Sequence, residues 1–233
     1  MSGGLPHDLD AMAETDAYNA WLVDRAKPWL HGRVLDVGAG IGTHTTRLVE
    51  LADEVVALEP EAELAALLRT RVPTATVVEG DAWSVDGPFD AILCFNVLEH
   101  VADDRAVFSR FAELLAPGGA VCVIVPAHPR LFGSLDKAFG HERRYTRREL
   151  REKLTSAGLE PVTVRHVNPA GAAGWFVQSR VLRRTSLPRD GLSLYDRLVP
   201  AFRAVDRVPT PVGLSLWAVA KTTGIASASA VNA

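Results

Sequence analysis

Short apolar runs alternate with amphipathic segments along the first 125 residues of the chain. Apolar runs typical of buried strands occupy residues 33–37, 54–60, 75–81, 89–100 and 120–128. Between them, apolar positions recur at helical spacing in residues 42–52, 61–72 and 103–119. Asp103 suits the start of the last helix, and Pro117 with two following glycines suits its end. This alternation predicts a parallel sheet with helices on both faces.

The pattern changes after residue 126. Residues 127–145 are rich in Gly, His, Arg and aromatic residues, and we expect an ordered loop there. A helix is predicted over 146–159, with Thr146 as its N-cap and Glu149 at the capping-box position. Two further strands are predicted over 160–168 and 213–221.

These patterns divide the chain into five parts. The 233 residues, 48% of them hydrophobic, suit one domain that carries an insertion. The expected parts are an N-terminal helical segment (1–30), a ligand-binding core (31–168), an insertion with one or two helices (169–209), a last strand that completes the core (210–221) and a small, polar, disordered tail (222–233).

Composition narrows the choice of partners. The formal net charge of −3 argues against a general nucleic-acid binder. No run of about 18 apolar residues is present, so no membrane-spanning helix is expected. No basic region followed by an apolar stretch stands at the N-terminus, so the cytoplasm is the expected location. Cys94 and Cys122 lie in apolar runs away from other metal-ligating residues, so we predict core positions for them and no metal site.

Three glycines stand in the stretch VLDVGAGIG, directly after the first predicted strand. Gly38, Gly40 and Gly42 let the main chain turn sharply and approach a ligand, next to the free N–H groups of a helix start. The third glycine comes one residue earlier than in the dinucleotide fingerprint, which favours a ligand without phosphates. A purely structural strand–helix turn is the alternative interpretation.

Polar side chains also end the next three predicted strands. Glu59 can accept both hydroxyls of a ribose, Asp81 can accept from an adenine amine, and Asn96 stands at the rim of the fourth strand. In open parallel sheets, ligands bind outside the carboxyl ends of the strands. The order of these side chains therefore predicts a nucleoside site.

The motifs LDVGAGIG, ALEP, EGDAW and FNVLEHVAD…LLAPGGAVCVIVP together resemble the class I S-adenosylmethionine-dependent methyltransferases. The similarity is close over residues 30–125 and looser at the last strand. It implies a Rossmann-like α/β fold, with a seven-stranded, mostly parallel sheet whose last strand is antiparallel. It also implies S-adenosyl-L-methionine as the cofactor.

The resemblance further implies roles for the matching residues. The methionine part of the cofactor would be lined by Asp36, Gly38, Ala39, Gly40 and Gly42. Glu59 would hold the ribose, and Asp81 and Ala82 would flank the adenine, with Trp83 packing on it. Asn96 and Val97 would contact the cofactor near the sulfonium.

The methyl acceptor is expected to meet residues 126–146, which begin at the carboxyl end of the fifth predicted strand. Many members of this family carry a stretch similar to GSLD…GHERRY. A hydroxyl acceptor needs a base, and the candidates for a base or orienting group are His141, then His128, then Tyr145. Alternatively, this stretch only pins a loop onto the sheet. His100 is interpreted as a packing or cofactor-loop residue.

Five arginines stand among residues 141–151. Guanidinium groups bind carboxylates and phosphates, so we expect that part of this cluster recognises an anionic acceptor, unless the arginines form a solvated face with internal ion pairs. The aromatic insertion 169–209 is expected to be a lid first, a homodimer surface second and a membrane-surface element third. The N-terminal segment is expected to close over the cofactor.

The leading functional hypothesis is methyl transfer from S-adenosylmethionine to a small molecule, with oxygen acceptors ahead of nitrogen and carbon. The acceptor can also be a natural product or be linked to a glycan or lipid. A nicotinamide-dependent oxidoreductase shares the glycine turn, but the short loop and EGDAW disfavour it. A binding module without catalysis is the third hypothesis.

Overall fold

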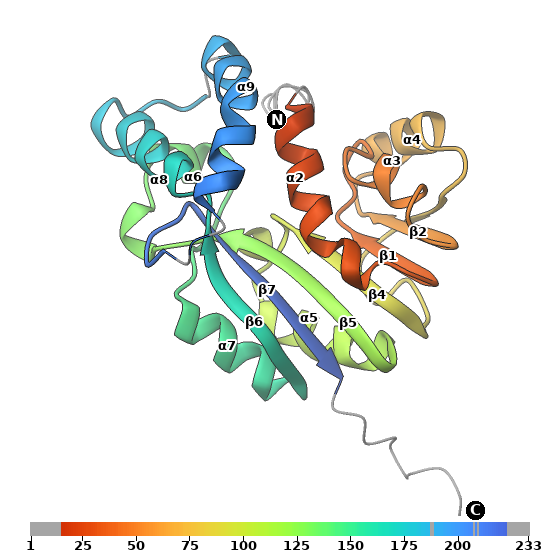
Figure 1. Ribbon diagram of the computed structural model, residues 1–233. Coiled ribbons are helices and arrows are strands. Elements are labelled where there is room, and N and C mark those ends of the chain that lie inside the picture. The colour runs from red at the N-terminus through yellow and green to blue at the C-terminus, as the bar shows by residue number, and fades with distance from the viewer. Residues whose placement is uncertain (1–14, 187–188, 207, 209, 223–233) are drawn as a thin grey trace, which may run out of the picture.

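The computed structural model describes residues 15–186, 189–206, 208 and 210–222. A central sheet of seven strands carries helices on both faces (Figure 1). The strands are β1 (Arg33–Val37), β2 (Glu54–Glu59), β3 (Thr76–Glu79), β4 (Phe89–Phe95), β5 (Leu115–Pro126), β6 (Leu159–Val167) and β7 (Ser215–Thr222). The α-helices are α2 (Asp16–Ala26), α3 (Thr45–Leu48), α4 (Ala62–Arg71), α5 (Asp104–Leu114), α6 (Ser134–Ala138), α7 (Arg147–Ser156), α8 (Pro169–Trp175) and α9 (Arg189–Val205). Short 3₁₀ segments are η1 (Lys27–Trp29), η2 (Leu98–His100) and η3 (Pro129–Leu131), and η4 (Phe176–Val181) is a π-helix that continues α8.

The strand order is β3-β2-β1-β4-β5-β7-β6. Strands β1 to β5 pair in parallel, whereas β7 runs antiparallel to both β5 and β6. The predicted Rossmann-like sheet with an antiparallel last strand is therefore confirmed. The winding reverses between β1 and β4, and in such sheets the crevice at this switch point is where ligands bind.

Apolar side chains pack on both faces of the sheet. On one face, Phe108 and Phe111 of α5 pack with Leu150 and Leu154 of α7. On the other face, α2 buries Trp21 and Leu22, together with Leu48 of α3. Both cysteines are free and buried in strands, as their apolar surroundings predicted.

Three local predictions differ from the structure. The helix expected over 42–52 is regular only over Thr45–Leu48, because after Leu48 hydrogen bonds spanning three and four residues alternate as the chain turns towards β2. Helix α5 ends at Leu114 rather than at Pro117, because Leu115 already pairs with Phe89 in the sheet. The loop over 127–145 contains η3 and α6. The predicted caps are present: Asp103 accepts from the Ala106 N–H, and Thr146 accepts from the Glu149 N–H.

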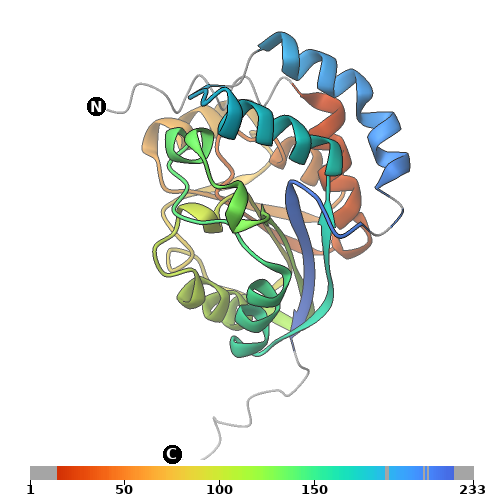
Figure 2. The same ribbon diagram turned by 90° about the vertical axis from the view of Figure 1, so that its left-hand side faces the viewer.

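The N-terminal segment and the insertion are joined to each other over one end of the sheet. Asp196 of α9 accepts hydrogen bonds from the backbone N–H groups of Ala17 and Tyr18 (3.2 and 2.9 Å). Asp206 forms a buried ion pair with Arg25 and accepts from the Asn168 N–H at 3.0 Å. Figures 1 and 2 show α2, α8 and α9 gathered at the same end of the molecule.

Residues 1–14 and 223–233, where part of the N-terminal segment and most of the expected tail fall, lie outside the described residues. Within the described part, no helix has the length and apolar character needed to cross a membrane.

Candidate functional site

A cavity of about 570 Å³ lies at the carboxyl ends of β1 and β4. Its wall is formed mainly by the glycine turn, the end of β4 with η2, and the loop before α7. The helices α2, α8 and α9 also contribute side chains to it. Side chains that line it include Tyr18, His44, Phe95, Asn96, Glu99, His100, Phe139, His141, Arg144, Trp175, Gln178 and Tyr195. Residues of both the insertion and the N-terminal segment thus line the cavity, and the predicted role of the insertion as a lid stays a prediction.

The glycine turn has the backbone conformation for which its sequence is suited. Gly38 has a φ of 68°, and a Cβ there would stand 2.5 Å from the Val97 side chain. The Gly40 N–H donates to Glu59 at 2.7 Å, so the carboxylate that ends β2 holds the turn that follows β1. Four of the predicted cofactor residues line the cavity: Gly38, Ala39, Gly40 and Asn96.

Two predicted cofactor carboxylates are buried below the turn. Asp36 accepts from the Thr45 hydroxyl at 2.7 Å, and burial raises its pKa to about 7. Glu59 accepts from the N–H groups of Gly40 and Glu61, which oppose the rise in its pKa that burial causes. Because each oxygen of a carboxylate has two lone pairs, Glu59 retains acceptor capacity for a ribose.

The predicted adenine residues follow β3 and do not line this cavity. Asp81 is exposed and accepts from the Trp83 N–H at 3.0 Å. Ala82 is buried, whereas 55% of Trp83 is exposed. Trp83 therefore lies on the surface, beside the edge of the sheet that ends at β3.

His141 lines the cavity and is held from behind by a carboxylate. Its Nδ1 lies 3.0 Å from Asp136 Oδ1, and its backbone N–H donates to the Asp136 carbonyl at 2.8 Å. The ring lies parallel to that of Trp175. A carboxylate can only accept, so Nδ1 carries the proton and Nε2 keeps a lone pair when the ring is neutral.

Asp136 is the buried centre of this arrangement. It also accepts from Arg144 Nε at 2.6 Å, from the Gly133 N–H at 2.9 Å and from Trp175 Nε1 at 3.3 Å. Burial acts to raise the pKa of Asp136, but the hydrogen bond from His141 and the Arg144 guanidinium lower it below its ordinary value. Asp136 therefore stays charged and fixes the tautomer of His141.

Glu99 is a site residue that the sequence analysis missed. The side chain is fully buried, and its two carboxylate oxygens have no hydrogen-bond partner in any other residue that the structure describes. Burial raises its pKa to about 8. Its Oε1 lies 4.0 Å from His141 Nε2, and Glu99, His100 and His141 place potential metal-ligand atoms within 4.8 Å of one another. These three residues form no recognisable spacing motif in the sequence. The adjacent Glu and His directly after a strand are nevertheless a local signal that could have indicated a site.

His128 does not line the cavity. Its ring stacks on that of His166, with ring centroids 4.6 Å apart and planes at 3°. Its φ of 59° turns the chain after β5, and burial lowers its pKa. The structure thus separates His128 from His141, which the sequence analysis had treated as alternatives for one role.

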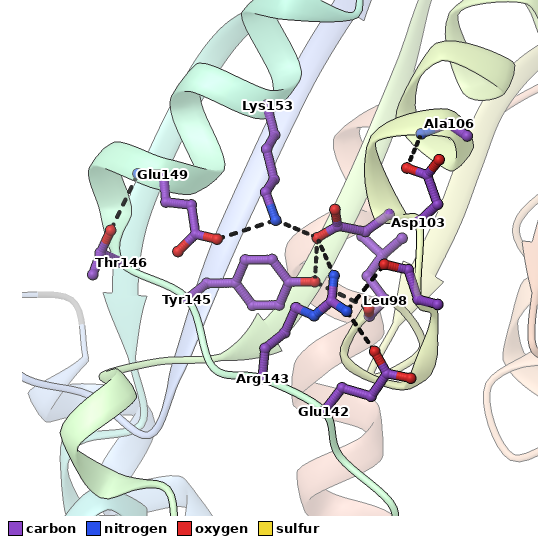
Figure 3. Close-up of polar contacts among 11 residues, drawn as sticks. Leu98, Asp103, Ala106, Glu142, Arg143, Tyr145, Thr146, Glu149 and Lys153 are labelled. Atoms are coloured by element: carbon purple, nitrogen blue, oxygen red, sulfur yellow. Dashed lines mark hydrogen bonds and ion pairs between the residues drawn. The ribbon is translucent and has the colours of Figure 1, made fainter.

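Tyr145 does not line the cavity and lies in a buried polar network (Figure 3). Its hydroxyl donates to Asp104 (2.7 Å) and lies 3.0 Å from the Leu98 carbonyl, and Lys153 Nζ is 2.5 Å from the same Asp104 carboxylate. Burial, reinforced by Asp104, raises the pKa of Tyr145 well above its ordinary value. These contacts tie the loop before α7 to η2 and α5, and they favour a structural role for Tyr145.

Most of the arginine cluster is bound within the protein. Arg143 pairs with Asp104 and Glu142, Arg147 donates to the Val164 carbonyl, and Arg148 pairs with Glu152. Within this cluster only Arg144 lines the cavity, and Asp136 balances its charge. The arrangement favours internal ion pairs over recognition of an anionic acceptor.

Comparisons with known proteins agree with this geometry. A family model described as a methyltransferase domain matches residues 11–164, more than half of the chain. The uncharacterized methyltransferase Rv3342 of Mycobacterium tuberculosis is 35% identical over 111 residues, which cover 46% of this chain and 45% of that protein. A ubiquinone biosynthesis O-methyltransferase of Xanthomonas campestris is 36% identical over 97 residues, covering 38% of this chain and 41% of that protein. The chain thus spans less than half the length of these relatives. The fold also matches DhpI, solved as a complex with SAH, with a TM-score of 0.62, 19% identity, and coverage of 94% of this chain and 91% of that one.

Proposed function

The chain belongs to the methyltransferase domain family, and from this premise we propose that it transfers the methyl group of S-adenosylmethionine to a hydroxyl oxygen of a small-molecule acceptor. The donor would lie across the ends of β1 to β4. Gly38, Ala39 and Gly40 would line its methionine part, above Asp36 and Gly42. Asn96 and Val97 would contact the region of the sulfonium.

The nucleoside part of the donor would extend from the glycine turn towards β3. Glu59 would accept from the ribose hydroxyls while it holds the Gly40 N–H. Asp81 and Ala82 would flank the adenine, and the exposed Trp83 ring would close over it. The strand order supports this path, because β1, β2 and β3 are consecutive neighbours in the sheet.

The acceptor would enter between η2 and the insertion. The observation that carries this proposal is the Asp136–His141 contact of 3.0 Å, which leaves the Nε2 lone pair free on the cavity side. A hydroxyl has a proton to lose before or during its attack on the methyl group, and a fixed imidazole serves as base or orienting group for that proton. An amine with a neutral fraction needs no such residue, so the arrangement favours oxygen over nitrogen.

The name of one relative, a ubiquinone biosynthesis O-methyltransferase, points the same way. A cavity of about 570 Å³ with rings from Tyr18, Phe139 and Trp175 suits an acceptor with an apolar body. A natural-product acceptor, or one linked to a lipid or glycan, is consistent with this lining.

The test is to incubate the full chain with methyl-labelled S-adenosylmethionine and matched sets of hydroxylated, aminated and carbon-acceptor compounds. We expect labelled methyl ethers, with turnover strongly reduced by His141→Gln and unchanged by His128→Gln. Labelled amines alone, or equal loss in both variants, would contradict the proposal. Calorimetry with S-adenosylhomocysteine and with NAD provides the control for the donor, since binding of NAD alone would point to an oxidoreductase.

A further inference from the structure

Three potential metal ligands from two distant segments meet on one side of the cavity. Glu99 and His100 form part of η2, directly after β4, and His141 comes from the loop before α7. The Glu142 N–H donates to the Glu99 carbonyl at 2.8 Å, so the backbone itself holds the two segments together. The three potential ligand atoms lie within 4.8 Å of one another.

Both histidines carry the outer hydrogen bond that is typical of metal ligands. His141 Nδ1 lies 3.0 Å from the Asp136 carboxylate, and His100 Nδ1 lies 3.2 Å from the Gly140 carbonyl. Either acceptor requires a proton on Nδ1, which leaves Nε2 of each ring with a free lone pair. Histidines that bind metals almost always donate their second ring N–H to a carboxylate or carbonyl in this way.

Glu99 supplies the third, independent observation. Glu99 is fully buried, yet neither carboxylate oxygen has a hydrogen-bond partner in any other residue of the described part of the chain. A buried polar group without a partner costs free energy, and a buried charge costs more. A cation between Glu99 and the two histidines would satisfy this carboxylate.

We propose that Glu99, His100 and His141 bind one divalent first-row transition-metal cation on the side of the cavity formed by η2 and the loop before α7. Two imidazoles and one carboxylate suit Zn²⁺, Mn²⁺, Fe²⁺ or Co²⁺, whereas Mg²⁺ and Ca²⁺ prefer all-oxygen sites. In tetrahedral coordination, metal–ligand bonds of 2.0–2.2 Å place the donor atoms about 3.3–3.6 Å apart. Side-chain shifts of less than about 1 Å each would therefore close the site.

This inference rests on the proposed function for its chemical role. Three protein ligands leave coordination positions open, as in catalytic metal sites. The acceptor hydroxyl would bind there, and its lowered pKa would release the proton to water. The oxygen would then form the new O–CH₃ bond while the S–CH₃ bond breaks, and that electron pair would return to sulfur as the thioether of S-adenosylhomocysteine. His141 would thus orient the acceptor through the cation.

Cobalt titration tests the site directly. The full chain, freed of metal with a chelator, is titrated with Co²⁺ while visible absorption is recorded. We expect one Co²⁺ per chain, with bands typical of mixed nitrogen and oxygen ligands. Glu99→Gln, His100→Ala and His141→Ala should each weaken Co²⁺ binding by at least about tenfold, and Asp136→Asn by about 10–100-fold through the lost negative charge behind His141.

His31→Ala, which removes an exposed histidine that does not line the cavity, is the matched control and should leave Co²⁺ binding unchanged. Calorimetry with S-adenosylhomocysteine checks that each variant is folded. Absence of the bands at stoichiometric Co²⁺, or equal Co²⁺ affinity in all variants, would overturn the inference, as would full methyl transfer by the metal-free enzyme. The titration contains neither donor nor acceptor. A cobalt site without methylation of any hydroxyl would therefore refute the proposed function and leave the metal site intact.

Discussion

The carboxyl ends of β1 to β4 and the segment after β5 hold their polar side chains in different ways. In the first region the contacts are local or join neighbouring strands: Thr45 donates to Asp36, nine residues away, and Gly40 donates to Glu59, nineteen residues away. In the second region, Asp136 binds nearby residues, His141 five and Arg144 eight residues away, but it is also held by contacts between segments far apart in the chain. Trp175 donates to Asp136 across 39 residues, and the backbone of Glu142 reaches that of Glu99.

This difference separates the two halves of the proposed reaction. The first region would form the proposed cofactor site from its own strands, so substitutions there should change cofactor affinity. The second region places His141 through a buried pair of opposite charges, Asp136 and Arg144. Substitutions there should change stability and acceptor chemistry, while cofactor affinity stays the same.

The largest effect is expected from Asp136→Ala. This change leaves the Arg144 guanidinium, 1% exposed, without its charged partner, and breaking such a buried pair costs about 3–5 kcal/mol. Urea denaturation should show a fall of that size in the free energy of unfolding. Arg148→Ala is the control, because the Arg148–Glu152 pair is exposed to solvent and contributes little to stability. Similar losses in both variants would erase the contrast between the two regions.

The next effect concerns pH and Asp36. Its pKa is raised to about 7 in the folded chain by burial, from an ordinary 3.8, so the folded state binds the proton more tightly. The stability that this group contributes is therefore greatest below its unfolded pKa and is lost as pH rises through the folded value. Between pH 5 and 7 the loss amounts to about 2 kcal/mol.

Asp36→Asn removes this titration. The difference in unfolding free energy between wild type and Asp36→Asn should change by about 2 kcal/mol over the same interval. The wild type should become less stable relative to the variant as pH rises. Other titrating groups cancel in this difference. Parallel stability curves for the two proteins would show that Asp36 is charged in the folded state at pH 5.

Glu59→Ala should weaken S-adenosylhomocysteine binding by about 1–3 kcal/mol, because buried hydrogen bonds are lost. Asp81→Ala should weaken S-adenosylhomocysteine binding within the same range, but without the loss of stability expected for Glu59, which also holds the Gly40 and Glu61 N–H groups. Calorimetry and urea denaturation separate the two effects. Unchanged affinity in both variants would refute the proposed path of the nucleoside.

The smallest effect is expected from Tyr145→Phe. It removes a hydrogen bond to Asp104 in the network of Figure 3 and should lower stability by about 1–2 kcal/mol. Because Tyr145 does not line the cavity, kcat measured below the melting range should remain within about twofold of wild type. A large fall in kcat without a loss of stability would restore Tyr145 as a catalytic candidate.

The sheet and the glycine turn could be predicted because their signals are local. Apolar runs marked β1 to β7, and the caps Asp103 and Thr146 lie where their side-chain chemistry places them. The helix over 42–52 was overestimated, because periodicity does not report where the chain must turn to enter the next strand. The end of α5 was misplaced for a similar reason: the register of β4 against β5, rather than Pro117, decides it.

By itself, the sequence determined the α/β alternation, the strand ends that carry Gly38, Glu59 and Asn96, and the family resemblance. Tertiary structure alone decided that Glu99 meets His141, that His128 stacks on His166, and that Tyr145 faces Asp104. The physical reason lies in the range of the interactions. Periodicity and capping act within a few residues, whereas the partner of a buried charge depends on which distant segments pack together.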